Sequence, residues 1–265
     1  MKKIFLILTL IMGVAVQSKA ETITYETCGD CQSCGENCKY MTNGSKIYVL
    51  GPTQKNSDGS ISEGKVSYRA FFECAGKNDC HSTIPETITD LEMSGNITQI
   101  GESAFHFSGL KNITLAPSVT TIGWRAIYYN TNLENLVLPS ENIDFANGEI
   151  FADTKVNSIE TSASNLQGFL EHYGELKKDE NGKINITCTV GDCEKYLKEE
   201  SKYKDNTDIL NSIRFLPIEV QNKDGSRSVF LNGRFLGFKG KRIYTVEEAE
   251  MVTKPSGNRF RIRYH

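Results

Sequence analysis

The chain has 265 residues, of which 38% are hydrophobic, 24% charged and 9% aromatic. This ordinary globular composition excludes a disordered or collagen-like protein, and the length is ample for a buried core. The 22 glycines and six prolines exclude a low-complexity linker protein, whereas the formal net charge of −3 by itself excludes no class of protein.

Residues 1–20 have the pattern of a secretory signal peptide. Two lysines near the start precede the apolar run 5–16, and Ser18 and Ala20 are the small residues of a cleavage site. The run is too short for a spanning helix, and no later run reaches the ~18 residues that one needs. We expect a mature protein that starts at Glu21, has no transmembrane span and is secreted, periplasmic or on the cell surface. The alternative, a retained membrane anchor, is disfavoured by the short flanks.

All eight cysteines lie after the signal. An even count in an oxidising compartment implies disulfides, although the sequence alone does not fix the pairing. Short spacings favour Cys74–Cys80 and Cys188–Cys193 as local pairs. The other four would then pair among themselves: Cys28, Cys31, Cys34 and Cys38.

These four N-terminal cysteines also have the spacing of an iron–sulfur motif. Lys39 stands where that motif has a proline, and no second copy follows. Four thiolates are chemically able to hold a structural zinc ion as well. Because export favours oxidation, we expect disulfides, no metal and no cofactor, with zinc and an iron–sulfur cluster as the alternatives. Residues 21–84 are assigned to a Cys-rich N-terminal cap, in which Asn43–Gly44 precedes the alternating strand 46–50.

A repeat of 22 or 23 residues dominates the middle of the chain. Leu-x-x-Ile-x-Leu at 110–115 recurs at 133–138, and Ile-Gly-x-x-Ala at 100–104 recurs at 122–126. Alternate residues of each first segment point inward along a short strand, and 119–122 forms a second extended segment. Stacked units would bury a continuous ladder, so residues 85–175 predict a β-rich solenoid. Its inward residues are Leu91, Ile113, Leu136 and Ile159.

At these residues the sequence resembles the BspA-type leucine-rich repeat family of bacterial surface proteins, whose repeat looks like L-x-x-I-x-L-P-x-S-V-T-x-I-G-x-x-A-F. Residues 110–126 follow it closely, residues 88–105 follow it with one deletion, and residues 133–155 keep the strand but lose the Ile-Gly. Residues 34–51 resemble the strand pair that often precedes such repeats, which implies a hairpin capping the solenoid. The resemblance implies an exported interaction or adhesion module.

Beyond residue 160 the repeats degrade. Apolar residues at helical spacing predict a helix over 166–176, and alternation predicts a strand over 184–190. Asp192 is a candidate N-cap for a helix that ends at Tyr203. We assign 176–220 to an irregular repeat with a helical cap.

Residues 221–265 predict an appended β-rich module. Asn232–Gly233 between two apolar runs indicates a hairpin, Thr245 opens a short helix, and arginines alternate with apolar residues over 259–264. The module holds ten basic and four acidic residues, while the rest of the mature chain is acidic. This tail would pack on the acidic body of its own chain or make an electrostatic contact with a partner.

The search for catalytic patterns finds no metalloprotease, nucleophile-elbow or phosphate-loop motif. His106 lies on a returning segment of the repeat, where we expect it to be solvated. The segment 54–65 fails as a calcium loop at Gln54 and Lys65, and no basic stripe interleaved with aromatic residues points to nucleic acid. We therefore expect a protein that is not an enzyme.

The remaining functional surface is the outward face of the repeat strands, which would offer a regular surface to a protein or cell-surface macromolecule. Two alternatives stay open: an envelope spacer whose outward residues are merely solvated, and an enzyme with its site in 176–265. The candidate partner-binding residues are Asp90, Glu92, Asn112, Thr114, Asn135, Val137, Ser158 and Glu160.

Overall fold

The structure is a computed structural model that describes residues 23–76, 79–146, 148–172, 174–221, 226–232 and 234–239. The expected signal peptide, the helix opening at Thr245 and the strand over 259–264 lie outside these residues. Within the described ranges, no helix combines the length and apolar character needed to cross a membrane.

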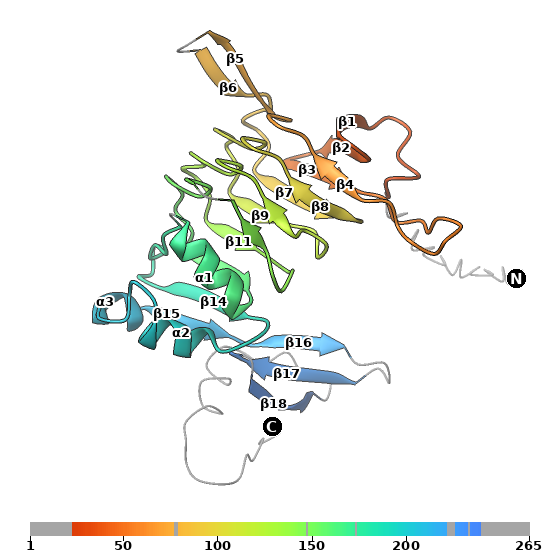
Figure 1. The fold of residues 1–265 in the computed structure, drawn as a ribbon. Coiled ribbons are helices and arrows are strands. Elements are labelled where there is room, and N and C mark those ends of the chain that lie inside the picture. Colours follow the sequence, from red (N-terminus) through yellow and green to blue (C-terminus); the bar gives the residue numbers. More distant parts are fainter. Residues whose placement is uncertain are drawn as a thin grey trace, which may run out of the picture.

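An open nine-stranded sheet runs through most of the fold, in the order β1-β2-β3-β7-β9-β11-β13-β14-β15 (Figure 1). Strands β1 to β3 pair antiparallel, and from β3 onward every neighbour is parallel. Such parallel pairing requires a crossover between successive strands, which the repeat supplies. The strands are β1 (Gln32–Gly35), β2 (Cys38–Asn43), β3 (Lys46–Leu50), β7 (Asp90–Ser94), β9 (Asn112–Thr114), β11 (Asn135–Val137), β13 (Ser158–Thr161), β14 (Ile184–Cys188) and β15 (Ile213–Leu216).

A second, four-stranded parallel sheet has the order β12-β10-β8-β4. The expected extended segment 119–122 contributes only its last two residues to this sheet. The repeats that begin with β7, β9 and β11 thus each supply one strand to each sheet and then a returning segment, whereas β13 is followed by a helix. The strands are β4 (Gly64–Val66), β8 (Ile97–Ile100), β10 (Thr121–Ile122) and β12 (Asp144–Phe145).

The repeat register places equivalent residues side by side. Leu91, Ile113, Leu136 and Ile159 are register partners in β7, β9, β11 and β13, and each is at most 2% exposed. Their alternation with partly exposed residues gives each strand one buried and one outward face. The predicted inward ladder and the β-rich character of the fold are confirmed.

The N-terminal hairpin continues the large sheet beyond the repeats. Gly44 adopts a φ of 61° at the turn between β2 and β3, a conformation that glycine reaches without strain. Strand β3 then pairs with β7 so that Ile47 lies beside Leu91. Another hairpin, β5 (Phe72–Gly76) and β6 (Asp79–Ser82), projects from the repeats at the upper end of the view (Figure 1).

Both predicted helices form but end early. Helix α1 (Ala163–Glu171) stops five residues before the expected end, where the Gly174 N–H donates to the Phe169 carbonyl at 2.9 Å and closes the last turn. Helix α2 (Cys193–Glu199) begins at the predicted cap, since the Asp192 side chain accepts from the Lys195 N–H. It ends before Tyr203, whose hydroxyl instead accepts from the Leu176 N–H. A short helix, α3 (Thr207–Leu210), precedes β15.

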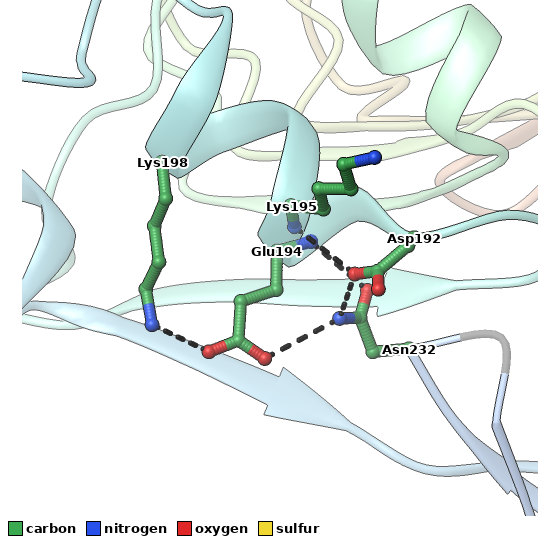
Figure 2. A network of polar contacts seen from close by, with 5 residues as sticks. All are labelled: Asp192, Glu194, Lys195, Lys198 and Asn232. Atoms are coloured by element: carbon green, nitrogen blue, oxygen red, sulfur yellow. Dashed lines mark hydrogen bonds and ion pairs between the residues drawn. The ribbon is translucent and has the colours of Figure 1, made fainter.

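A three-stranded antiparallel sheet follows β15, formed by β16 (Ile218–Gln221), β17 (Arg227–Leu231) and β18 (Arg234–Lys239). Asn232 turns the chain between β17 and β18, with a φ of 49°. Figure 2 shows how this turn meets α2: the Asn232 amide donates to Asp192 Oδ1 at 2.7 Å, and its carbonyl oxygen accepts from the Glu194 N–H at 3.1 Å. The helix N-terminus therefore fixes the tip of the appended hairpin.

The eight cysteines lie in four pairs, all of them in the described residues. The two expected local pairs, Cys74–Cys80 and Cys188–Cys193, have Cα–Cα distances of 4.0 and 6.0 Å. The N-terminal four divide into Cys28–Cys31 and Cys34–Cys38, at 5.6 and 5.2 Å. These distances are within the range that disulfides span, apart from the shortest, which is just below it.

Candidate binding face

The eight candidate partner-binding residues lie together in two rows on the large sheet, which we call the outward face. Register pairing aligns the members of each row across β7, β9, β11 and β13. Every member is partly exposed and alternates with a buried neighbour. The first row is Asp90, Asn112, Asn135 and Ser158, and the second row is Glu92, Thr114, Val137 and Glu160.

Hydrogen bonds connect three of the four side chains of the first row. The Asn135 amide donates to Asn112 Oδ1 at 2.6 Å, and the Asn112 amide donates to Asp90 Oδ1 at 2.7 Å. The other Asp90 oxygen accepts from the Thr89 hydroxyl at 2.7 Å. The Thr89 hydroxyl, with a smaller effect from the Asn112 amide, holds the pKa of Asp90 below its usual value. The row therefore carries a fixed negative charge at neutral pH.

The two glutamates of the second row differ. Glu92 accepts from Lys46 Nζ at 2.8 Å, and this hydrogen bond raises the pKa of the lysine. Glu160, by contrast, has no side-chain hydrogen bond or ion pair with any other described residue, and burial raises its pKa. The attraction of a cation brought by a partner would offset the cost of keeping the Glu160 carboxylate charged where it is partly buried. Glu160 is thus an acid of this face whose charge no hydrogen bond or ion pair within the described structure offsets.

Neighbouring strands extend both rows beyond the predicted residues. Asn185 and Thr187 on β14 align with Ser158 and Glu160, and Arg214 on β15 aligns with Asn185. The alternation around Ile184 and Ile186 is the signal that would have found the first two. No repeat signal marks β15, so its place in the rows follows only from the fold.

The returning segments carry a second cluster, which the sequence analysis missed. Aromatic rings from three of them pack together: Phe72 stacks on His106 with centroids 4.4 Å apart, and Phe107 contacts Tyr129 at 4.4 Å with the two rings tilted by 47°. The expectation that His106 is solvated was wrong, because these rings leave it only 7% exposed. Its two ring nitrogens have no hydrogen-bond partner in the described structure. Burial, followed by the charges of Arg125 and Arg69, lowers its pKa to about 4.

The described residues hold no group of three or more His, Cys, Asp or Glu side chains suited to a metal ion. The model of the family described as BspA type leucine rich repeat region matches residues 78–173 in six copies. No curated protein and no solved structure matches the chain. The matched segment includes α1 and the strands that carry the outward face, which are β7, β9, β11 and β13. Residues 78–173 are therefore similar to the BspA-type leucine-rich repeat region over about a third of the chain.

Proposed function

We propose that this protein is an exported, non-catalytic module whose repeats stack as a solenoid and hold a protein or other cell-surface macromolecule on the outward face. BspA-type repeat regions generally serve as surface or protein-interaction modules, and the family is typically non-catalytic. The observation that carries the proposal is the alignment of eight partly exposed side chains in two continuous rows.

The chemistry of the rows suits a partner that carries positive charge. Hydrogen bonds pre-organise Asp90 and Asn112, so little side-chain entropy is lost when a partner binds them. Glu160 on β13 supplies an acid without a cation among the described residues. Between them, Thr114 and Val137 offer a small, nearly neutral surface.

The outward face is tested by one arginine substitution at two places. Thr114→Arg puts a bulky cation in the middle of the face, and Thr120→Arg makes the same change at an exposed position beside the second sheet. Mature protein and both variants are used to capture macromolecules from the native environment of the protein. We expect Thr114→Arg to lose the captured partner and Thr120→Arg to keep it. If both variants retain the partner, the outward face is not the binding surface and a spacer role is favoured.

Export is supported by the N-terminal pattern and by the four cysteine pairs. N-terminal sequencing of the protein from the non-cytoplasmic fraction should begin at Glu21, and non-reducing peptide mapping should recover the four pairs. Soluble cytoplasmic protein that keeps Met1 would contradict export. Stoichiometric zinc with free thiols at the four N-terminal cysteines would favour the metal site instead.

A further inference from the structure

The returning segments of the repeats form a surface distinct from the outward face, which we call the return edge. Four large aromatic side chains are exposed on it: Tyr68 is 56% exposed, Phe107 41%, Trp124 38% and Tyr129 40%. Clusters of exposed apolar side chains mark binding surfaces more often than isolated ones do. Two arginines, Arg69 and Arg125, lie among these rings.

The repeat itself gathers these rings. Backbone hydrogen bonds join one returning segment to the next, from Ser103 N to Trp124 O and from Phe107 N to Tyr128 O. Phe107 and Tyr129 consequently occupy the same position of successive repeats, and their centroids lie 4.4 Å apart. Buried His106 stacks beneath Phe107 at 4.6 Å. The exposed rings thus rest on a packed layer and are held in place before any ligand arrives.

The arginines further fix the rings. The Arg69 guanidinium lies 5.0 Å from the Tyr68 centroid, and the Arg125 guanidinium lies 4.3 Å from the Trp124 centroid. Arg125 also donates from Nε to Glu149 at 2.9 Å. Planar guanidinium groups that donate paired hydrogen bonds, and the Glu149 carboxylate that accepts them, therefore lie directly against the aromatic rings.

The charges of the return edge decide what kind of ligand fits. Over the returning segments 67–72, 101–108, 123–130 and 148–154 the sequence has two arginines and three acids, and Arg125 is paired with Glu149. His106 stays uncharged above pH of about 4. These segments therefore lack the large excess of one sign that attracts a polyanion or a polycation. A neutral ligand that combines an apolar face with many hydroxyl groups meets both features of this surface.

We propose that the return edge binds neutral oligosaccharides. The C–H face of a pyranose ring stacks on Trp124 or on the Phe107–Tyr129 pair. Its equatorial hydroxyls then donate to Glu149 and accept from the arginine side chains. The site is independent of the outward face, so one chain would hold a macromolecular partner on one side and a glycan on the other.

The chain carries its own reporter, because Trp124 is its single tryptophan. Mature full-length protein is titrated with cellohexaose, chitohexaose, mannohexaose and maltohexaose while tryptophan emission is followed. We expect saturable change with at least one of the four. The double variant Phe107→Ala/Tyr129→Ala keeps the reporter and should weaken that binding at least tenfold. Thr114→Arg on the outward face is the matched control and should bind the glycan as the unaltered protein does.

Three results would overturn this inference. The first is the absence of saturable binding to any of the four hexasaccharides, and the second is equal binding by the double variant with an unchanged thermal melt. The third is concentration-dependent self-association, seen in sedimentation, that the double variant abolishes, since the edge would then be a contact between copies of the chain. Loss of the captured partner in Thr114→Arg bears only on the outward face, so the two proposals fail separately.

Discussion

The outward face and the return edge belong to the same repeats, yet they carry different chemistry. On the outward face, polar side chains of successive repeats hydrogen-bond to one another, as Asn135 does to Asn112. On the return edge, rings of successive repeats pack against one another, as Phe107 does against Tyr129. The period of the repeat aligns equivalent positions on both sides. The residue type at each position then decides what each side can bind.

The largest expected effect separates the core from the outward face on one strand. Leu136→Ala should lower the free energy of unfolding by about 2–5 kcal/mol, because the buried leucine leaves a cavity. The adjacent outward change, Val137→Ala, should cost less than about 1 kcal/mol, since this side chain is already partly exposed. Urea denaturation of both variants measures the contrast. Equal losses would mean that the assigned register does not distinguish inward from outward residues.

The return edge should make stability depend on pH. The pKa of His106 is lowered from 6.5 to about 4, so the unfolded chain binds a proton more readily than the folded one between these values. The stability that neutral His106 contributes is therefore fully present above pH 6.5. It is lost as the pH drops toward 4, by about 3 kcal/mol at most. His106→Phe, which matches Phe72 on the preceding segment, should flatten this part of the profile. Thermal melts from pH 4 to 7 of both proteins test it, and identical profiles would contradict the buried neutral histidine.

Two asparagines, one buried and one on the outward face, compare the cost of losing a side-chain hydrogen bond in the core and at the surface. Asn130 is fully buried and donates to the carbonyls of Phe105 and Ile127, both at 2.8 Å. Asn130→Ala leaves these carbonyls without their donor and should cost about 1–3 kcal/mol. Asn112→Ala on the outward face should cost less than about 1 kcal/mol, because water replaces the lost partner. Denaturation curves compare the two variants. A larger loss in the free energy of unfolding for Asn112→Ala would show that the hydrogen-bonded row on the outward face stabilises the fold.

The smallest expected effect on folding is that of Thr114→Arg. A partly exposed threonine replaced by arginine should change the free energy of unfolding by less than about 0.5 kcal/mol. Its effect on partner binding should nevertheless be large if the outward face is the contact surface. Chemical denaturation run beside the capture experiment separates these two effects. Unfolding of this variant would remove the basis for assigning Thr114 to a binding surface.

Short-range patterns predicted the parts of the fold that depend on neighbours in sequence. The leucine spacing gave the register of β7, β9, β11 and β13, and Asp192 marked the start of α2. The helix ends were less predictable, because α1 ends where the Gly174 N–H bonds to the Phe169 carbonyl, a contact that the apolar spacing does not mark. The two rows of the outward face followed from alternation along each strand, which is a local property.

The sequence by itself determined the repeat, its inward ladder and the turn at Asn232, since each depends on the type and spacing of a few adjacent residues. Only the tertiary structure decided that β14 and β15 extend the large sheet and that His106 is buried. The hairpin β5–β6 interrupts the period after Phe72, so the stacking of Phe72 on His106 has no regular spacing in the sequence. Parallel pairing and ring stacking join residues that are distant along the chain, and their free energy depends on burial in the folded chain rather than on local propensity.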